Sequence, residues 1–388
     1  MKPTLYLPIA LVLLATICLN GAAIEARTQF LPGQPWPDDK GVHINAHGGG
    51  IMHHAGVYYW FGEHKIAGRA GNAAHVGVHV YSSRDLYNWK DEGVALAVSD
   101  DAASDIVKGC VIERPKVIHN PRTGKFVMWF HLELKGQGYT AARVGVAVAD
   151  KPVGPYTYQR SFRPNAGHWP INATDEQKAA LANIAALKGK SFSGGPNAET
   201  PKHPILARDF SGGQMSRDMT LFVDDDGAAY HLCASEENST LHISRLSDDF
   251  LSTSGKYMRI FENRWNEAPA ICRHQSRYWL LSSGCTGWNP NPARSAVAES
   301  IWGPWKELPN PCVGVNPHNR RGTELTFGGQ STYILPVAGK PGAFIAMFDI
   351  WRPDDAIAGG YAWLPMTFAE DRFTITWRDE WNLSVFKQ

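Results

Sequence analysis

The stretch that decides the fold is Asn266-Glu-Ala-Pro-Ala-Ile-Cys-Arg-His-Gln-Ser-Arg-Tyr-Trp-Leu-Leu281. It opens with one acidic residue, Glu267, which stands directly before Ala-Pro and a short apolar run. A polar turn at residues 274–277 follows, and an aromatic segment then resumes the apolar pattern. Two short apolar runs on either side of a polar turn are typical of a β-hairpin. The stretch therefore predicts a hairpin whose first strand begins at a polar side chain.

The same layout occurs four more times, each time with a different polar residue at its head. These other head residues are His47, Glu113, Asp218 and Gln330. In all five copies an aromatic residue of the second strand follows the head after eleven to fourteen residues. Evenly repeated hairpins are typical of a β-propeller, in which the innermost strand of every blade lies around a central axis. We therefore expect an all-β, five-bladed propeller whose five head residues converge on one pocket.

Two further features support an internal repeat and mark an insertion. The second and fourth copies end in the same Gly-Pro-aromatic sequence, at residues 154–156 and 303–305. Between the second and third copies, a segment of about residues 161–213 does not fit the repeat, and we expect it to be partly helical. Within it Thr174 and Gln177 have the spacing of a capping box, and Gly189 can end the helix. Two interpretations stay open: this insertion shapes a binding subsite, or it is a loop without a functional role.

The N-terminus has the pattern of a secretory signal peptide. Lys2 gives a charged start, residues 5–19 are apolar, and residues 21–23 are small, as a cleavage site requires. A lipoprotein signal is less favoured, because Ile17 precedes Cys18 where a small residue would be expected. We expect removal of residues 1–23 and a periplasmic or secreted protein. Residues 24–388 would form a single propeller domain, with residues 377–386 as its last strand.

The composition excludes several classes of partner. The net charge is +1 without any basic block, so neither nucleic acid nor an anionic membrane surface is expected, and no protein partner is implied. No later apolar run is long enough to span a membrane. Five cysteines at irregular spacing follow Cys18, which favours buried free thiols over disulfides. Without a CxxC or HExxH motif we expect no metal and no cofactor. The fourteen tryptophans suit packing between blades and stacking on sugar rings.

Three of the five head residues, Glu113, Asp218 and Glu267, are carboxylic acids. Carboxylates crowded around one axis repel one another, so at least one should have a raised pKa. A carboxyl group that stays protonated near neutral pH is what glycoside hydrolysis needs as its general acid. The alternative is that these acids cap loops or form ion pairs with their neighbours Arg114 and Arg217.

The motifs that carry a family resemblance run through nearly the whole mature chain apart from the insertion. In order they are Ala46-His-Gly-Gly-Gly-Ile51, Tyr59-Trp-Phe-Gly-Glu63, Glu113-Arg-Pro-Lys-Val117, Val127-Met-Trp-Phe-His131, Ser216-Arg-Asp218, Asp225-Asp-Gly227, Glu267-Ala-Pro269 and Thr286-Gly-Trp-Asn-Pro290. This pattern resembles glycoside hydrolase family 43, five-bladed propellers that act on polysaccharides. Within that family it is most similar to the exo-β-1,3-galactanase branch and its bacterial relatives.

The resemblance assigns roles to the acidic residues. Glu267 matches the general acid of the family, and Asp218 matches the carboxylate that orients this acid and tunes its pKa. In most of the family a third carboxylate on the first blade activates water, whereas this chain has Ala46-His47-Gly48 there. The galactanase branch shares that gap, and a glutamine of the last blade is its proposed substitute. Gln330 is the nearest match, with Glu113 as the other candidate for the base.

The same matching implies a set of substrate contacts. Glu63, Glu113, Tyr139 and Asn238 are candidates to bind the hydroxyl groups of the terminal sugar, and Trp288 is a candidate stacking face. His47 is expected near the floor of the pocket, either as a structural histidine or as a substrate contact.

The function expected from this pattern is exo-acting, acid-assisted and inverting hydrolysis that removes a terminal sugar from a polysaccharide or oligosaccharide. Galactose from β-1,3-galactan or arabinogalactan side chains is the leading expectation. An α-L-arabinofuranosidase of the same family is the alternative enzyme. The sequence does not decide between galactose and arabinose, because the shape of the pocket determines which ring size is bound. A carbohydrate-binding propeller without catalysis is the alternative from another class, but such a binder has no use for Glu267 and Asp218.

Overall fold

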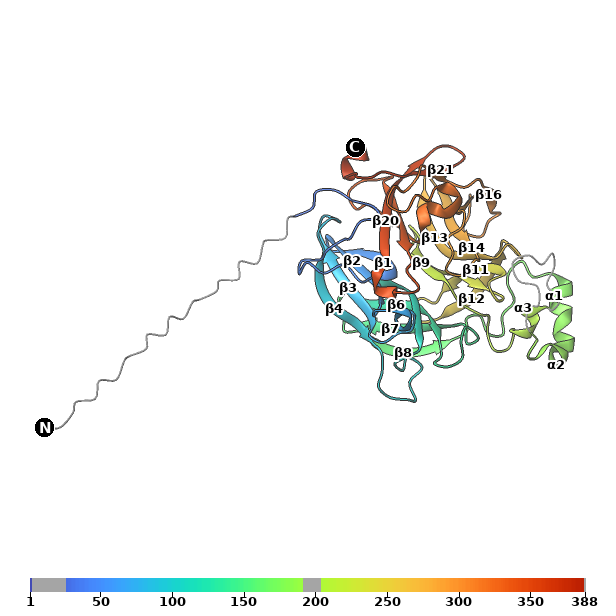
Figure 1. Ribbon diagram of the computed structural model, residues 1–388. Helices are drawn as coiled ribbons and strands as arrows, with labels where there is room; N and C mark the ends of the chain where they lie inside the picture. Colours follow the sequence, from blue (N-terminus) through green and yellow to red (C-terminus); the bar gives the residue numbers. More distant parts are fainter. Residues whose placement is uncertain (2–25, 191–203, 387–388) are drawn as a thin grey trace.

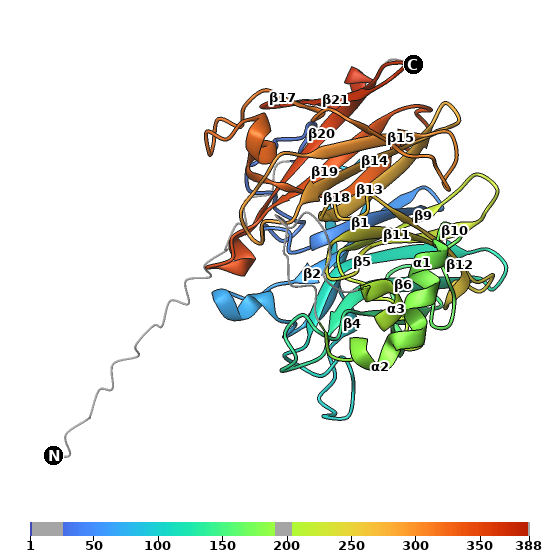
Figure 2. The same cartoon turned by 90° about the vertical axis from the view of Figure 1, so that its right-hand side faces the viewer.

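The computed structural model describes Met1, residues 26–190 and residues 204–386. These residues form five sheets around a common axis, as Figures 1 and 2 show, and each sheet is built from consecutive strands that pair antiparallel except for one short parallel pair in the fifth sheet. The expected five-bladed, all-β propeller is therefore confirmed. The signal-peptide prediction lies outside the described residues apart from Met1.

The first blade consists of β1 (His47–His54), β2 (Val57–His64), β3 (Gly77–Ser83) and β4 (Lys90–Ala97). The second blade consists of β5 (Val111–Asn120), β6 (Lys125–Glu133), β7 (Arg143–Ala149) and β8 (Thr157–Phe162). The third blade consists of β9 (Met219–Val223), β10 (Ala229–Ser235), β11 (Thr240–Leu246) and β12 (Thr253–Ile260). The fourth blade consists of β13 (Asn266–His274), β14 (Arg277–Gly284), β15 (Arg294–Ala298) and β16 (Lys306–Leu308). The fifth contains β18 (Gln330–Pro336), β19 (Phe344–Ile350), β20 (Gly360–Phe368), β21 (Phe373–Thr376), with β17 (Cys312–Val313) parallel to β21.

The innermost strands β1, β5, β9, β13 and β18 contact one another in a closed ring. Short 3-10 helices lie between strands at η1 (Arg69–Asn72), η4 (Thr323–Gly328) and η5 (Ala356–Ala358), and η6 (Leu383–Val385) follows the last strand. Apolar side chains of neighbouring blades interdigitate between the sheets and form the core. No helix of the described residues is long and apolar enough to cross a membrane.

Tryptophan side chains close the ring between the last blade and the first. Trp36, Trp60, Trp89 and Trp363 are buried against one another there, so part of the tryptophan content serves blade packing as expected. The N-terminal segment reaches this seam through an isolated bridge between Phe30 and Trp381. The expectation that residues 377–386 form the last strand is wrong, because the ladder ends at Thr376 and this segment packs across the seam instead.

The insertion between β8 and β9 is partly helical, as the sequence predicts. It contains α1 (Asp175–Ala179), η2 (Ala180–Asn183), α2 (Ile184–Leu187) and α3 (Ile205–Arg208), while residues 191–203 lie outside the described part. The capping box is present, since the Thr174 side chain accepts from the Gln177 N–H and Gln177 bonds back to Thr174. The helices lie on the outside of the propeller (Figure 2), and Asn172 exchanges two hydrogen bonds with the backbone of Arg259 on β12.

Each innermost strand is irregular where its head residue lies. Register shifts follow His47, Glu113 and Glu267, and another lies between Ser331 and Tyr333, directly after Gln330. On the third blade Arg217 and Asp218 both bond to the backbone of Ala234, which is also a two-against-one pairing. Such bulges bend a strand and redirect its side chains. The irregularity therefore recurs at or beside every head residue, at the start of each inner strand.

Candidate active site

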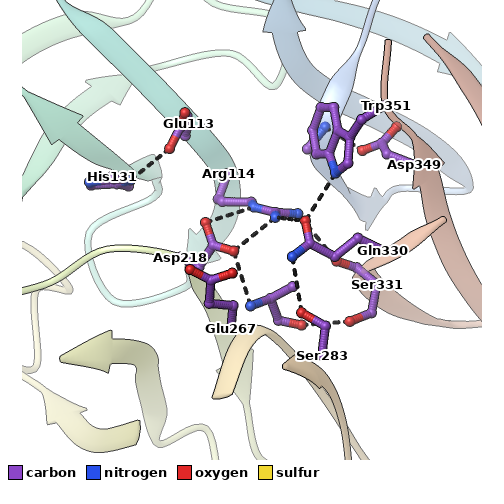
Figure 3. Close-up of polar contacts among 12 residues, drawn as sticks. Glu113, Arg114, His131, Asp218, Glu267, Ser283, Gln330, Ser331, Asp349 and Trp351 are labelled. Atoms are coloured by element: carbon purple, nitrogen blue, oxygen red, sulfur yellow. Dashed lines mark hydrogen bonds and ion pairs between the residues drawn. The ribbon is translucent and has the colours of Figure 1, made fainter. Parts of the chain in front are cut away.

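A cavity of about 320 Å³ opens on the propeller axis at the bulged ends of the inner strands. Its lining comes from all five blades: Glu63, Glu113, Arg114, His131, Tyr139, Arg217, Asp218, Asn238, Glu267, Cys285, Gly287, Trp288, Gln330 and Trp351. Eight of the nine site residues predicted from the sequence are in this set, and His47 is the exception. Figure 3 shows Arg114 between Asp218 and Gln330, Glu267 beside Asp218, and Glu113 directed toward His131.

Asp218 is held in one orientation by three hydrogen bonds. Arg114 donates to both carboxylate oxygens, from Nε at 3.1 Å and from Nη2 at 2.8 Å, and the backbone N–H of Ala268 donates to Oδ2 at 3.0 Å. A two-pronged arginine–carboxylate pair fixes both direction and charge. Because Ala268 directly follows Glu267, the same contact fixes Asp218 relative to Glu267.

Glu267 combines a raised pKa with an asymmetric set of donors. Burial and the nearby negative charge of Asp218 raise the pKa of Glu267 to about 7. Its Oε1 atom accepts from Asn238 Nδ2 at 2.8 Å and from the Cys285 thiol at 3.2 Å. Since both donors occupy Oε1, Oε2 is the oxygen that is left to carry the acidic proton. A carboxyl group with these properties can donate a proton near neutral pH.

Glu113 is an ionised carboxylate in a buried charge array. His131 lies between Glu113 and Glu133, with Nδ1 3.0 Å from Glu113 Oε2 and Nε2 2.9 Å from Glu133 Oε1. Burial opposes the imidazolium form, but hydrogen bonds to both carboxylates outweigh it and raise the pKa of His131 to about 9. Burial likewise opposes ionisation of Glu113, but the bond and charge of His131, the charge of Lys65 and a 2.6 Å bond from the Tyr139 hydroxyl lower the pKa of Glu113 to about 2.

Gln330 has a fixed amide orientation. Its Oε1 atom accepts from Arg114 Nη2 at 2.6 Å and from the Trp351 indole N–H at 2.9 Å, and its Nε2 donates to Ser283 Oγ at 3.0 Å. Both lone pairs of the amide oxygen are therefore in use. The amide nitrogen spends one of its two N–H groups on Ser283, which leaves the other for a water or a substrate oxygen.

His47 is the site residue for which the prediction of a substrate contact is wrong. It is completely buried, its ring stacks on Tyr361 with centroids 5.2 Å apart, and its Nδ1 lies 3.7 Å from Asp349 Oδ1. The cavity wall nearby is made instead by Glu63, whose Oε1 accepts from the Arg114 backbone N–H and whose Oε2 lies 2.5 Å from Lys65 Nζ. The bulge after His47 accounts for this placement, since it turns the histidine ring into the seam between the first and last blades.

Aromatic side chains form part of the cavity wall. Trp288 and Tyr139 are 41% and 44% exposed, and the Trp288 ring meets Trp351 edge-on at 5.7 Å. Exposed aromatic faces beside hydrogen-bonding groups suit the two kinds of surface that a sugar ring presents.

One group of the described residues, Glu113, His131 and Asp218, brings three possible metal-ligand atoms within 4.8 Å of one another. Both ring nitrogens of His131 already face carboxylates, and Asp218 already binds Arg114. A metal ion would have to displace the imidazolium proton and compete with the guanidinium. These side chains form internal ion pairs rather than an open coordination site.

The sequence did not identify five of the polar or aromatic side chains on the cavity as site residues: Arg114, His131, Arg217, Cys285 and Trp351. The sequence suggests Arg114 as a partner of Glu113, its neighbour in the chain, but Arg114 binds Asp218 instead. Its backbone has φ +55°, a conformation that non-glycine residues rarely adopt and that sequence does not reveal. His131 and Trp351 do follow strand patterns that could have pointed to them, since both stand near the ends of second strands beside the axis.

Comparisons with known proteins agree with this geometry. A sequence profile described as glycosyl hydrolases family 43 matches residues 165–335. A solved family 43 β-1,3-galactosidase with galactodeoxynojirimycin is 51% identical to this chain, with a TM-score of 0.81, over 91% of this chain and 100% of its own. The chain belongs to glycoside hydrolase family 43.

Two more solved relatives are exo-β-1,3-galactanases. The enzyme from Phanerochaete chrysosporium, solved with β-1,3-galactotriose, is 30% identical at a TM-score of 0.72, over 92% of this chain and 68% of its own. The enzyme from Clostridium thermocellum is 32% identical at a TM-score of 0.71, over 91% of this chain and 66% of its own. Among curated proteins, none matches this chain. Membership in family 43 makes the protein a glycoside hydrolase, and the resemblance stated from its motifs is confirmed.

Proposed function

We propose that this family 43 enzyme releases terminal galactose from β-1,3-galactan, including that of arabinogalactan, by exo-acting hydrolysis with inversion. The observation that carries the proposal is the pairing of Glu267, whose pKa is raised to about 7, with an oriented Asp218 in a small axial cavity. The three solved relatives whose names specify β-1,3-galactosidase or exo-β-1,3-galactanase activity support the choice of galactose over arabinose.

The shape of the cavity supports attack at a chain end. About 320 Å³ lies at the small end of the range of ligand sites, and the walls come from all five blades. Such a pocket suits one terminal sugar unit, whereas cleavage within a chain needs an open cleft across the face. The polar groups of Glu63, Glu113 and Asn238 would meet the hydroxyl groups, with Trp288 and Trp351 beside the ring.

Glu267 would act as the general acid. Its Oε2 proton passes to the glycosidic oxygen as the bond to the anomeric carbon breaks, so the leaving sugar departs as a neutral alcohol. Asp218 supports this step by keeping the carboxyl protonated until substrate binds, and the Asn238 and Cys285 donors stabilise the carboxylate that forms.

Gln330 would hold the water that attacks the opposite face of the anomeric carbon. Its remaining amide N–H can donate to the water oxygen, while the amide itself is kept rigid by Arg114, Trp351 and Ser283. Glu113, tied to His131 and Tyr139, would mainly bind substrate hydroxyl groups.

Product analysis tests this proposal. Incubation with linear β-1,3-galactan should release galactose as the first and main product, and NMR should show the α-anomer before mutarotation. Release of arabinose from arabinan, without galactose from galactan, would establish the arabinofuranosidase alternative. Binding of β-1,3-galacto-oligosaccharides without any hydrolysis would establish the binding-module alternative.

We also propose that the protein acts in the periplasm or outside the cell. The apolar N-terminal segment followed by small residues supports export. All five cysteines after Cys18 are free thiols, four of them buried, so the fold does not depend on an oxidising compartment. We expect the protein in the culture medium or in a periplasmic extract to begin at residue 24. Mass spectrometry of the N-terminal peptide measures this.

A further inference from the structure

A second hollow, of about 880 Å³, lies beside the catalytic cavity and is built largely by the insertion. Its lining carries five cationic side chains, Arg163, Lys188, Lys190, Arg208 and Arg217, against the two carboxylates Asp209 and Glu237. The whole chain has a net charge of only +1, so positive charge is concentrated here. We call this hollow the cationic groove.

The two carboxylates of the cationic groove are already paired with arginine. Arg208 binds Asp209 through two hydrogen bonds of 2.7 Å and also donates to Glu237 at 2.6 Å. Arg163 lies 3.7 Å from Asp209 and donates to the carbonyl groups of Ala141 and Thr140. These contacts stabilise the floor of the groove, and they neutralise the negative charges of its two carboxylates.

Three cations of the groove have no carboxylate partner among the residues that the structure describes. Among the described residues, no carboxylate lies within 4.0 Å of the charged nitrogens of Lys188, Lys190 or Arg217. Arg217 donates from Nη2 to the carbonyl oxygen of Tyr139, which orients the guanidinium without neutralising it. A concave surface with excess charge of one sign attracts ligands of the opposite sign.

The cationic groove adjoins the catalytic cavity. Arg217 lines both, and its neighbour in the chain is Asp218. Tyr139 and Asn238 line the cavity, while the adjacent Thr140 and Glu237 line the groove. One branched oligosaccharide could therefore place one sugar unit in the groove and another at the catalytic carboxylates.

We propose that the cationic groove is a subsite for an anionic sugar unit carried by the galactan substrate. Lysine and arginine bind carboxylates and sulfate esters by charge-assisted hydrogen bonds, and Ile184 and Met215 add apolar surface for a sugar ring. A uronate and a sulfated galactose share this chemistry, and the experiment separates them. The inference rests on the proposed galactan-hydrolysing function and assigns the insertion its role in substrate selection.

The test compares three β-1,3-galacto-oligosaccharides that differ in one branch unit: glucuronic acid, its neutral counterpart glucose, and sulfated galactose. The variant Lys188→Gln/Lys190→Gln removes two charges of the groove and touches no residue of the catalytic cavity. The matched control Lys178→Gln/Lys306→Gln removes two exposed lysine charges that lie outside the groove.

We expect the groove variant to lower kcat/KM for an anionic substrate about three- to tenfold through KM, because each exposed ion pair contributes modestly. The neutral substrate and the control variant should keep wild-type values, and 0.5 M NaCl should abolish the preference for the anionic substrate. If the groove variant has a lower kcat/KM for the uronate substrate alone, the groove is a carboxylate site. If its kcat/KM is lower for both anionic substrates, the groove is a general anion site. Equal values for charged and neutral substrates in wild type and variant would overturn the subsite.

The proposed function fails separately, if wild-type enzyme cleaves none of the three oligosaccharides. In that case calorimetric titration of Glu267→Gln with the same compounds still tests the groove. Tighter binding of the anionic than of the neutral compound, weakened by Lys188→Gln/Lys190→Gln, supports the subsite, and equal binding overturns it.

Discussion

Arg114 binds Asp218, which lies 104 residues away in the chain, and not its sequence neighbour Glu113. The left-handed backbone at Arg114 and the bulge between Glu113 and Lys116 turn the two adjacent side chains to different partners. Arg114 therefore joins the second blade to Asp218 on the third and to Gln330 on the fifth. One buried guanidinium therefore orients both the Asp218 carboxylate, the proposed support of the acid, and the Gln330 amide, the proposed water-binding group.

Arg114→Lys is expected to lower kcat about ten- to a hundredfold, because lysine keeps the charge but loses the two-pronged contact, and a hydrogen bond to a charged group contributes about 1.5–3 kcal/mol. Steady-state kinetics on β-1,3-galactobiose, with Tm measured in parallel, checks this. The control is Arg122→Lys, whose partner Asp248 is a highly exposed residue. An unchanged kcat in a folded Arg114→Lys protein would show that the orientation of Asp218 is unimportant.

The fold and the placement of most candidate residues on the cavity could be predicted because they follow from a repeat. Head residues such as Asp218 and Glu267 occupy equivalent positions at the start of inner strands, and a closed ring of such strands brings them together. The capping box at Thr174 could likewise be predicted from the sequence, because it depends only on two residues that lie three positions apart. Local spacing and repetition carry this information.

The contacts that tune the site could not be predicted, because they join different blades through irregular backbone. Neither the Arg114–Asp218 pair nor the Cys285–Glu267 contact has a sequence signature. His47 occupies the same repeat position as the acidic heads, yet it is buried on Tyr361. Position in the repeat predicts that a residue lies near the axis, but the local bulge decides whether its side chain reaches the cavity.

Glu267→Gln is expected to lower the rate on natural galactosides by about a hundred- to ten-thousandfold, because the amide has no proton to donate to the leaving oxygen. Substrates with a 2,4-dinitrophenyl leaving group need little protonation and should lose far less. Comparing kcat/KM on both substrate types measures the difference, with the exposed Glu299→Gln as control. Equal losses on both types would mean that Glu267 is not the proton donor.

The Cys285 contact predicts a change in pH dependence. Burial and Asp218 set the pKa of Glu267 at about 7, so kcat/KM should fall as pH rises above 7 and the acid loses its proton. The thiol bond stabilises the carboxylate and lowers that pKa, so Cys285→Ala should move the alkaline limb upward by about half a pH unit. Cys285→Ser retains a donor and is the matched control. A limb that shifts downward or stays fixed in Cys285→Ala would contradict this role.

The buried His131 predicts a pH-dependent contribution to stability. Its pKa is raised from 6.5 to about 9, so its ion pairs stabilise the fold fully below pH 6.5 and less as pH rises through 9. The pKa of Glu113 is lowered from 4.5 to about 2, so its contribution is complete above pH 4.5 and is lost as pH falls toward 2. The array therefore contributes most between pH 4.5 and 6.5.

His131→Gln should accordingly lower the free energy of unfolding by about 3–5 kcal/mol in that window, because Glu113 and Glu133 lose the cation between them. Urea unfolding at several pH values measures this, with the exposed His318→Gln as control. The difference from wild type should shrink as pH rises past 9. A pH-independent difference would assign the loss to packing instead of charge.

The role of Gln330 gives the sharpest test of the hydrolytic step. Its amide oxygen accepts from Arg114 and Trp351, so it has no lone pair left to take a proton from water, whereas one amide N–H stays available to hold the water oxygen. Gln330→Ala should therefore lower kcat by about two to three orders of magnitude with little change in KM, because the contact matters mainly in the transition state. The exposed Gln137→Ala is the control.

Glu113 is the competing candidate, and its chemistry predicts the opposite kinetic pattern. With a pKa of about 2 it is a weak base, and His131 and Tyr139 already bond to its oxygens, so Glu113→Gln should mainly raise KM. If Glu113 were the base, Glu113→Ala would lose kcat and azide would partly restore it by taking the place of the missing carboxylate. Near-wild-type kcat in Gln330→Ala, together with azide rescue of Glu113→Ala, would transfer the activation of water from Gln330 to Glu113.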